Sequence, residues 1–266
     1  AKTAILMRSC IWAMIYRHRR MVMLYSKSMD ASTELNEGVQ TEFTGNGILG
    51  ELYPKITYPF KALGGSGKRA SHQTYGGQLT RINLKAGVLR LANIPGEQAS
   101  GAMLISKPMS AARGQQKTVE LEGETIVLRP DFVAIDDPSD EEISASQPQT
   151  KKLLSTIKKG ILRGGGHSKT LAAAMAVTVI ALKDCADTFL KDPSWQSLRI
   201  PMMRKLPTNQ ELWDEYREIR HGFDPTSPGS QIRARLDCLE FYKKNQKAMD
   251  KGADPVWDWA FEFEDD

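Results

Sequence analysis

The chain has 266 residues, of which 41% are hydrophobic and 26% are charged, a balance that is ordinary for a soluble globular protein. Its formal net charge of +4 permits contact with nucleic acid but does not argue for it, because no long block of Lys and Arg stands out. The three cysteines are far apart and form no CxxC pair, which argues against a disulfide framework or a zinc site and favours a reducing compartment.

The first apolar stretch, from Ala4 to Tyr16, could be mistaken for a signal peptide or a membrane span. Arg8 interrupts it, the charges follow it instead of preceding it, and it is too short to cross a bilayer. We therefore expect a core helix and no membrane partner. Because the chain starts without Met, we also expect that the natural N-terminus lies upstream.

Hydrophobic periodicity predicts helices and buried strands in alternation along the chain. Helices are expected at 3–17, from a cap at Asp30 to the glycines at 45–47, and at 140–159, 183–191, 209–221 and 230–250. Strands are expected at 21–25, 80–85, 87–92, 101–106, 132–135, 171–180 and 198–205. Residues 44–78 are expected to be irregular, and 110–130 to form a polar loop with a small hairpin. This alternation indicates an α/β fold with a mostly parallel sheet flanked by helices.

Three segments could end a phosphate-binding loop, which needs backbone amides at a helix start, a Lys, and a Ser or Thr for Mg²⁺. Lys2-Thr3 precedes a predicted helix, but this dipeptide is common. The segment 64–68 ends in Lys68, but Arg69 follows it where Ser or Thr is needed. The segment 164–170 precedes a predicted strand instead of a helix. Flexible turns are the preferred interpretation of the last two segments.

A hydrophobic strand at 132–135 runs directly into Asp136 and Asp137. P-loop ATPases hold Mg²⁺ with the first acid of such a pair and use the second to orient or deprotonate the attacking water. The local pattern is equally typical of a strand that ends in an Asp-Pro turn with a helix cap.

Two further residues are candidates for contact with a nucleotide. Arg113, in a polar loop, could stabilise charge on a transferred phosphoryl group as an arginine finger does. Most lone loop arginines are simply solvated. Thr178, near the end of the strand expected at 171–180, could sense the phosphate, or it could be an ordinary β-branched strand residue.

Taken in order, these segments resemble the large terminase subunits of tailed phages and prophages. The match runs through nearly the whole chain and is most specific from Arg129-Pro130-Asp131 through Asp136-Asp137-Pro138 to the stretch 146–150. Lys2-Thr3 is similar to the end of the family's Walker A motif, Arg113-Gly114 to its Arg-Gly loop, and the stretch 177–180 to its coupling motif.

The resemblance implies an ASCE (RecA-like) P-loop ATPase that uses ATP and Mg²⁺ to drive double-stranded DNA into a procapsid. If the family's roles apply here, Lys2 binds phosphate, Thr3 and Asp136 hold Mg²⁺, and Asp137 activates water. Arg113 is the arginine finger, and Thr178 couples hydrolysis to motion. The implied partners are the DNA, the portal protein, the small terminase subunit and further copies in a ring. The implied location is the host bacterial cytoplasm.

The resemblance also implies a division into a motor domain, 1–206, and a helical segment, 207–266, that leads towards a nuclease domain. The nuclease, the first strand and most of the P-loop are expected to lie outside this sequence, since Ala1 stands where the loop's last Gly belongs. That first strand is expected beside the strand at 132–135. Without it, we expect these residues alone to bind ATP poorly and to hydrolyse none.

Two alternatives remain open from the sequence. One is a superfamily 2 helicase-like ATPase, which shares the strand-acid pattern but needs a second RecA-like domain. The other is a non-catalytic prophage remnant that acts at most as an interaction module.

Overall fold

The computed structural model describes residues 2–64, 66–112, 115–121, 123–166, 171–224, 226–227 and 229–257. It divides the chain into two compact units, Ala1–Trp195 and Gln196–Asp266. The boundary predicted from the sequence lies later, at residue 206. Each unit is described by itself.

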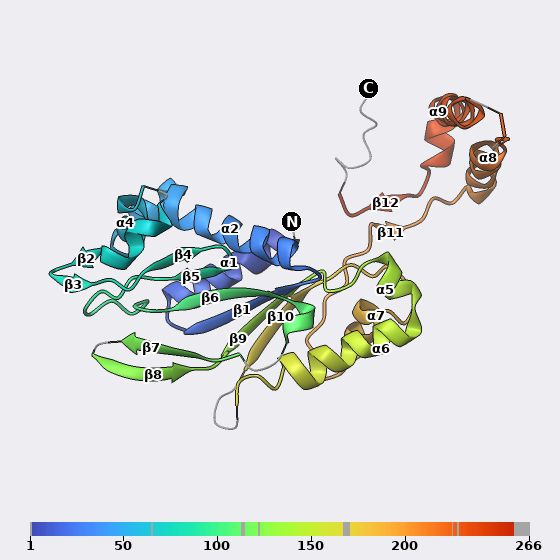
Figure 1. Ribbon diagram of the computed structural model, residues 1–266. Helices are drawn as coiled ribbons and strands as arrows, with labels where there is room; N and C mark the ends of the chain where they lie inside the picture. The colour runs from blue at the N-terminus through green and yellow to red at the C-terminus, as the bar shows by residue number, and fades with distance from the viewer. Residues whose placement is uncertain are drawn as a thin grey trace. The chain divides into compact units, whose positions relative to one another are not determined.

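A six-stranded sheet is the centre of the first unit, with the strand order β10-β9-β1-β6-β5-β4 (Figure 1). Its first four strands run parallel to one another, and β5 and β4 are antiparallel additions. The bounds are β1 Met21–Ser26, β4 Asn83–Lys85, β5 Val88–Arg90, β6 Met103–Pro108, β9 Phe132–Asp136 and β10 Ala172–Ala176. The expected α/β class with a mostly parallel sheet is confirmed.

Side chains of each central strand alternate between two apolar clusters, one on each face of the sheet. Val22 and Leu24 of β1 enter the first cluster, whereas Met23 and Tyr25 enter the second. Because both faces are covered, these strands are continuous apolar runs in the sequence, which is why they could be recognised.

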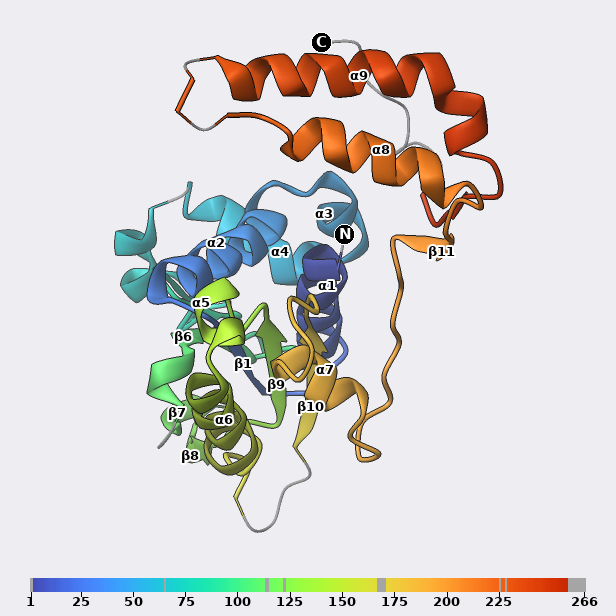
Figure 2. The same ribbon diagram turned by 90° about the vertical axis from the view of Figure 1, so that its right-hand side faces the viewer.

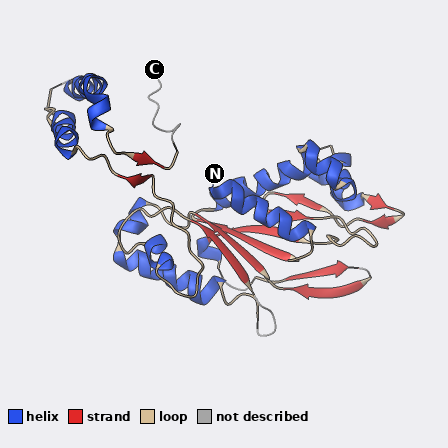
Figure 3. Cartoon of the chain, turned by 180° about the vertical axis from the view of Figure 1, so that it is seen from behind, coloured by secondary structure: helices blue, strands red, loops and turns tan. Residues whose placement is uncertain are grey.

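Helices cover both faces of this sheet, as Figure 3 shows from behind. The first cluster contains buried side chains of α1, α2 and α4, and the second contains those of α6, η3 and α7. The bounds are α1 Lys2–Ile15, α2 Met29–Gly45, α3 Gly47–Leu52, α4 Pro54–Ala62, α5 Glu141–Ala145, α6 Gln147–Ser155, the π-helical η3 Thr156–Ile161, and α7 Cys185–Leu190.

Short elements fill the remaining connections of the first unit. They are the 3₁₀ turns η1 Gly67–His72 and η2 Met109–Ala111, and the hairpins β2 Thr74–Tyr75 with β3 Gln78–Leu79 and β7 Lys117–Leu121 with β8 Glu124–Leu128. The hairpin expected within 110–130 is therefore present.

Several local expectations differ from the structure. Ser28, not Asp30, caps α2, and its hydroxyl accepts a hydrogen bond from the Ala31 amide. The segment 44–78 is largely helical instead of irregular, because Pro54 occupies the first turn of α4 and Asn46 caps α3. The helix expected at 140–159 breaks at Ser146, since Pro148 favours a new helix start there.

The expected position of an additional first strand is also wrong. It was placed beside 132–135, but β9 is bonded to β1 on one side and to β10 on the other. No edge of β9 is free, so a further strand could join this sheet only at β10 or β4.

Asp131 fixes the start of two of these strands. Its carboxylate accepts hydrogen bonds from the amides of Arg20, at 2.8 Å, and Met21, at 2.9 Å. The amide of Asp131 in turn donates to the Met21 carbonyl at 3.1 Å. These bonds align the beginnings of β1 and β9, so that their carboxyl ends come level at Ser26 and Asp136.

The second unit is a helical hairpin with a two-stranded ribbon, formed by β11 Met203–Lys205, α8 Gln210–His221, α9 Ser230–Met249 and β12 Asp254–Pro255. The Trp213 indole donates to the Met249 carbonyl at 2.8 Å and ties the two helices together. Trp213 and Tyr242 also have ring centroids 5.9 Å apart, so the aromatic side chains of α8 pack against α9.

Candidate functional site

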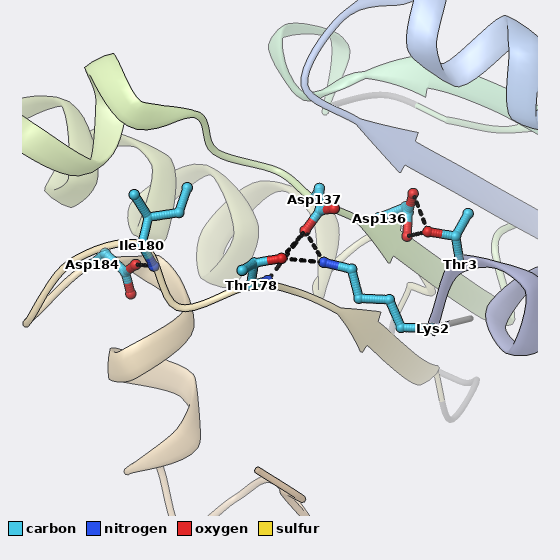
Figure 4. Close-up of polar contacts among 7 residues, drawn as sticks. All are labelled: Lys2, Thr3, Asp136, Asp137, Thr178, Ile180 and Asp184. Atoms are coloured by element: carbon cyan, nitrogen blue, oxygen red, sulfur yellow. Dashed lines mark hydrogen bonds and ion pairs between the residues drawn. The ribbon is translucent and has the colours of Figure 1, made fainter. Parts of the chain in front are cut away.

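Three of the predicted residues meet in one hydrogen-bonded group at the edge of the first unit (Figure 4). The Lys2 ammonium donates to a carboxylate oxygen of Asp137 at 2.6 Å and also to the Thr178 hydroxyl. The Thr178 amide donates to the same oxygen of Asp137 at 3.2 Å. These residues come from the first turn of α1, the end of β9 and the chain just after β10. The fold therefore joins segments that are remote in the sequence.

Thr3 and Asp136 form a second pair beside this group. The Thr3 hydroxyl lies 3.0 and 3.1 Å from the two carboxylate oxygens of Asp136 and donates to them. Asp136 ends β9 and is 7% exposed. Its burial raises the pKa of its carboxyl, the Thr3 hydrogen bond opposes that rise, and the charge of Asp137 adds to it.

Asp137 occupies an unusual backbone conformation. Its φ is +36°, on the positive side that residues other than glycine seldom adopt, although Asp tolerates it better than most. The Asp137 amide donates to the Ala176 carbonyl at 3.0 Å, one residue beyond the last paired position of β9. The chain turns there, and the turn directs the Asp137 carboxylate to Lys2 and Thr178.

Asp184, which was not predicted as a site residue, holds the loop that carries Thr178. Its carboxylate is fully buried and accepts from the amides of Ile180, at 2.7 Å, and Ala181, at 3.0 Å. It also caps α7 by accepting from the Asp187 amide at 2.7 Å. The predicted helix began at 183, but α7 begins at Cys185, so a helix start set one residue after Asp184 would have identified Asp184 as the cap.

A hollow of about 1020 Å³ opens next to these residues, at the carboxyl ends of β1 and β9. Asp136, Asp137 and Thr178 line it, together with Lys27 and Ser26 at the end of β1. In parallel α/β sheets, ligands bind outside the carboxyl ends of the strands. That rule points to Ser26 and Lys27, which the sequence analysis did not select.

The remaining candidates lie elsewhere. Arg113 is outside the described residues, so its role as an arginine finger stays a prediction. Lys68 is in η1, which no buried strand precedes, so the interpretation of 64–68 as a turn region fits its surroundings. The segment 164–170 is described only as far as Gly166, in a turn after η3.

The Thr3 and Asp136 oxygens suit a nucleotide-bound Mg²⁺ ion. In the described part of the chain, no three His, Cys, Asp or Glu side chains are grouped so that they could hold a metal by themselves. Mg²⁺ that enters with a nucleotide commonly takes one or two protein oxygens, with phosphates and water as its other ligands. A hydroxyl next to a carboxylate meets that requirement.

Comparison with known proteins identifies no relative. No family model matches the chain, and no curated protein or solved structure is significantly similar to it. Within the described ranges, every helix is too short or too polar to cross a bilayer.

Proposed function

We propose that this chain is the ATPase motor of a terminase large subunit from a tailed phage or prophage. It is a P-loop ATPase of the ASCE type, and in the host cytoplasm it uses Mg-ATP to move double-stranded DNA into a procapsid. Its partners in that work are the portal protein, the small terminase subunit and further copies of itself in a ring. The contact of Lys2 with Asp137 and Thr178, next to the Thr3–Asp136 pair, carries the proposal.

The geometry that supports the proposal is that Lys2, at the start of α1, lies beside Asp136 and Asp137, at the end of β9. The first amides of α1 and the Lys2 ammonium are the groups that bind phosphate oxygens. Thr3 and Asp136 would hold Mg²⁺, which bridges the phosphates and offsets their charge. In this proposal Lys2 exchanges Asp137 and Thr178 for the outer phosphates of ATP.

Asp137 is the residue that acts on water in this proposal. Once Lys2 turns to phosphate, the Asp137 carboxylate is free to accept a proton from the attacking water molecule. The Thr178 amide, 3.2 Å away, keeps the carboxylate oriented during that step. The loop of Thr178 is fixed by Asp184 and leads into α7, so a change in the contacts of Thr178 can be passed to the rest of the unit.

The charge of the hollow supports a nucleotide that arrives with a cation. Six carboxylates line it: Glu34, Asp136, Asp137, Asp140, Glu141 and Glu142. Among the described residues that line it, Lys27 is the one cationic side chain. Such a surface repels a bare triphosphate, whereas a magnesium complex has much of that charge neutralised.

Because these residues alone are expected to hydrolyse no ATP, the proposal is tested by phosphate release from Mg-ATP with the full-length polypeptide, which includes any residues that its gene encodes before Ala1 and after Asp266. Lys2→Ala and Asp136→Ala should each abolish turnover, and Lys55→Ala, an exposed lysine of α4, should leave it unchanged. No ATP binding by the wild type, or unchanged turnover with Asp136→Ala, would refute the proposed site.

A further inference from the structure

The distribution of acidic residues along the chain is uneven. Between Glu142 and Asp184 lie 41 residues with seven Lys or Arg and no Asp or Glu. The whole chain has 36 basic and 32 acidic residues, so the remainder has 29 and 32 and a net charge of −3. The positive net charge of the protein therefore comes from this one segment.

Much of the segment is the continuous helix formed by α6 and η3. Its inward face consists of Thr150, Leu153, Ile157 and Ile161, which are buried. The three hydrophobic residues pack in the second apolar cluster. In Figure 2, this helix lies on the side of the sheet opposite to α2.

The outward face of the same helix is cationic. Lys151, Lys152 and Lys159 are exposed, as is Arg163 just after the end of η3. None of the ion pairs in the described part of the chain includes any of these four residues. Arg129, which is also exposed, lies against Gly166, three residues after Arg163.

Lys158 differs from these four residues because its side chain makes contacts within the protein. Its ammonium is 2.6 Å from a carboxylate oxygen of Asp192 and 5.3 Å from the ring centroid of Phe189. This lysine therefore fastens the helix to the segment that follows α7, and it is not counted as part of the exposed surface.

The spacing and composition of the outward face suit the backbone of duplex DNA. At the α-helical rise of about 1.5 Å per residue, the twelve residues from Lys151 to Arg163 would span at most about 18 Å. Duplex DNA presents about one phosphate charge per 1.7 Å of its axis, so several phosphates lie within that reach. Residues 147–166 contain no aromatic side chain on which unpaired bases could stack, which disfavours single strands.

We propose that the outward face of α6 and η3, with Lys151, Lys152, Lys159 and Arg163, is a sequence-independent binding surface for duplex DNA. The choice of DNA as the polyanion rests on the proposed function. The positive surface itself does not, because it is inferred from four exposed basic residues that take part in none of the ion pairs of the described residues. α6 begins ten residues after Asp137, with only α5 between them, so this surface is connected to the candidate site by a short segment.

The test is the affinity of the full-length polypeptide for a random-sequence 30-base-pair duplex, measured by fluorescence anisotropy without nucleotide. A variant with all four residues changed to Gln should bind at least about tenfold more weakly at 0.1 M salt. The slope of log affinity against log salt should become shallower by about 3.6, since each of the four lost phosphate contacts removes about 0.9. A second variant, Lys152→Gln with Lys159→Gln, should show about half of that change in slope.

The matched control changes four exposed cations of α4 and η1, Lys55, Lys61, Lys68 and Arg69, to Gln. It removes the same charge from the same unit and should retain the wild-type affinity. An equal loss in both variants, full affinity in the α6–η3 variants, or no DNA binding by the wild type overturns the proposal. So does competition by polyglutamate as strong as that by DNA, which would indicate an acidic protein partner.

The outcome for this surface and the outcome for the proposed ATPase are separable. If the protein binds DNA through α6 and η3 but does not hydrolyse ATP, the proposed ATPase function is contradicted and the proposed DNA-binding surface is supported. The opposite result is ATP turnover that is lost with Asp136→Ala, combined with wild-type DNA affinity in the four-residue variant. That result would contradict the proposed DNA-binding surface and support the proposed ATPase site.

Discussion

Lys2 and Asp137 are 135 positions apart in the sequence, yet the Lys2 ammonium is 2.6 Å from a carboxylate oxygen of Asp137. In this arrangement the lysine that is proposed to grip phosphate is held by the carboxylate that is proposed to activate water. Both side chains are part-exposed, at 39% and 44%, so the pair contributes little to stability and can be exchanged for a ligand. In the proposed mechanism, this one contact would couple phosphate binding to water activation.

The first prediction concerns Asp137→Asn. Removal of the negative charge frees Lys2, so the affinity for Mg-ATP should be unchanged or higher. Turnover should fall by about 10²-fold or more, the usual loss for a general base. Measurement of kcat together with the nucleotide Kd separates the two effects, and Asp30→Asn, at an exposed position of α2, is the control. An unchanged kcat would remove Asp137 from the chemistry.

The second prediction concerns the titration of Asp136. Its pKa is raised mainly by burial, so its ionisation opposes folding at any pH above the folded-state pKa, and this penalty disappears below the ordinary Asp pKa of about 3.9. Asp136→Asn should therefore be more stable than the wild type at pH 7, and the difference should vanish under strongly acidic conditions.

Carboxyl carbon NMR measures the same pKa directly. Thr3→Val removes the hydrogen bond that favours the charged form, so it should move the Asp136 titration to still higher pH. A titration of Asp136 at or below that of an ordinary Asp would contradict the structure.

The third prediction concerns Asp184, whose buried carboxylate accepts three backbone N–H groups. Asp184→Ala leaves those donors without an acceptor and should cost about 3 kcal/mol in the free energy of unfolding. Asp184→Asn retains one oxygen and should cost less. Glu37→Ala, at an exposed position of α2, should change stability by no more than about 0.5 kcal/mol.

A role of Asp184 in positioning Thr178 has its own readout. In Asp184→Asn, the kcat of the folded protein should fall more than the KM rises, because substrate contacts remain while the Thr178 loop loosens. If Asp184→Asn lowers stability but leaves kcat unchanged, the residue serves the fold alone.

The fourth prediction compares two glycines with left-handed backbone. Gly101 has φ +69°, and an added Cβ would lie 2.8 Å from a methyl carbon of Leu121 and 3.0 Å from the amide oxygen of Asn93. Gly96 has φ +75° with no atom within 4 Å of the added Cβ. Gly96→Ala should cost about 1 kcal/mol for the backbone alone, and Gly101→Ala about 1–2 kcal/mol more. Equal shifts in urea midpoint would contradict the close packing at Gly101.

The fifth prediction concerns the thiols of Cys10 and Cys185. Burial raises the pKa of each to about 12, so almost no thiolate is present at pH 8. Both should resist a disulfide reagent in the native protein and react fully after denaturation. Rapid native labelling of either cysteine would contradict its burial.

The parts of the fold that could be predicted are those with a strong local pattern. β1 and β9 were recognised because burial on both faces makes them continuous apolar runs. α4 was missed because Pro54 and Pro59 fall within it, and a first-turn proline looks like a helix breaker in the sequence. The order of the strands was not predictable locally, since it is set by pairing between distant segments.

The candidate site was predictable to a similar extent. Lys2, Thr3, Asp136, Asp137 and Thr178 were selected from motif and resemblance, and the structure brings them together. Asp184 was missed because its partners are backbone groups of a loop, which leave no pattern of side chains. The cationic face of α6 was missed because basic residues were judged by their clustering, whereas the unusual feature is the lack of acids around them.

β10, at the edge of the sheet, consists of four alanines and Met175, and within the described residues it is bonded to β9 alone. Natural edge strands usually carry a charge, a proline or a bulge that prevents pairing with foreign chains. None of these is present in Ala172–Ala176, so the strand offers its backbone to any extended segment that reaches it. We expect this edge to favour pairing with another chain, and Ala174→Lys to oppose that pairing.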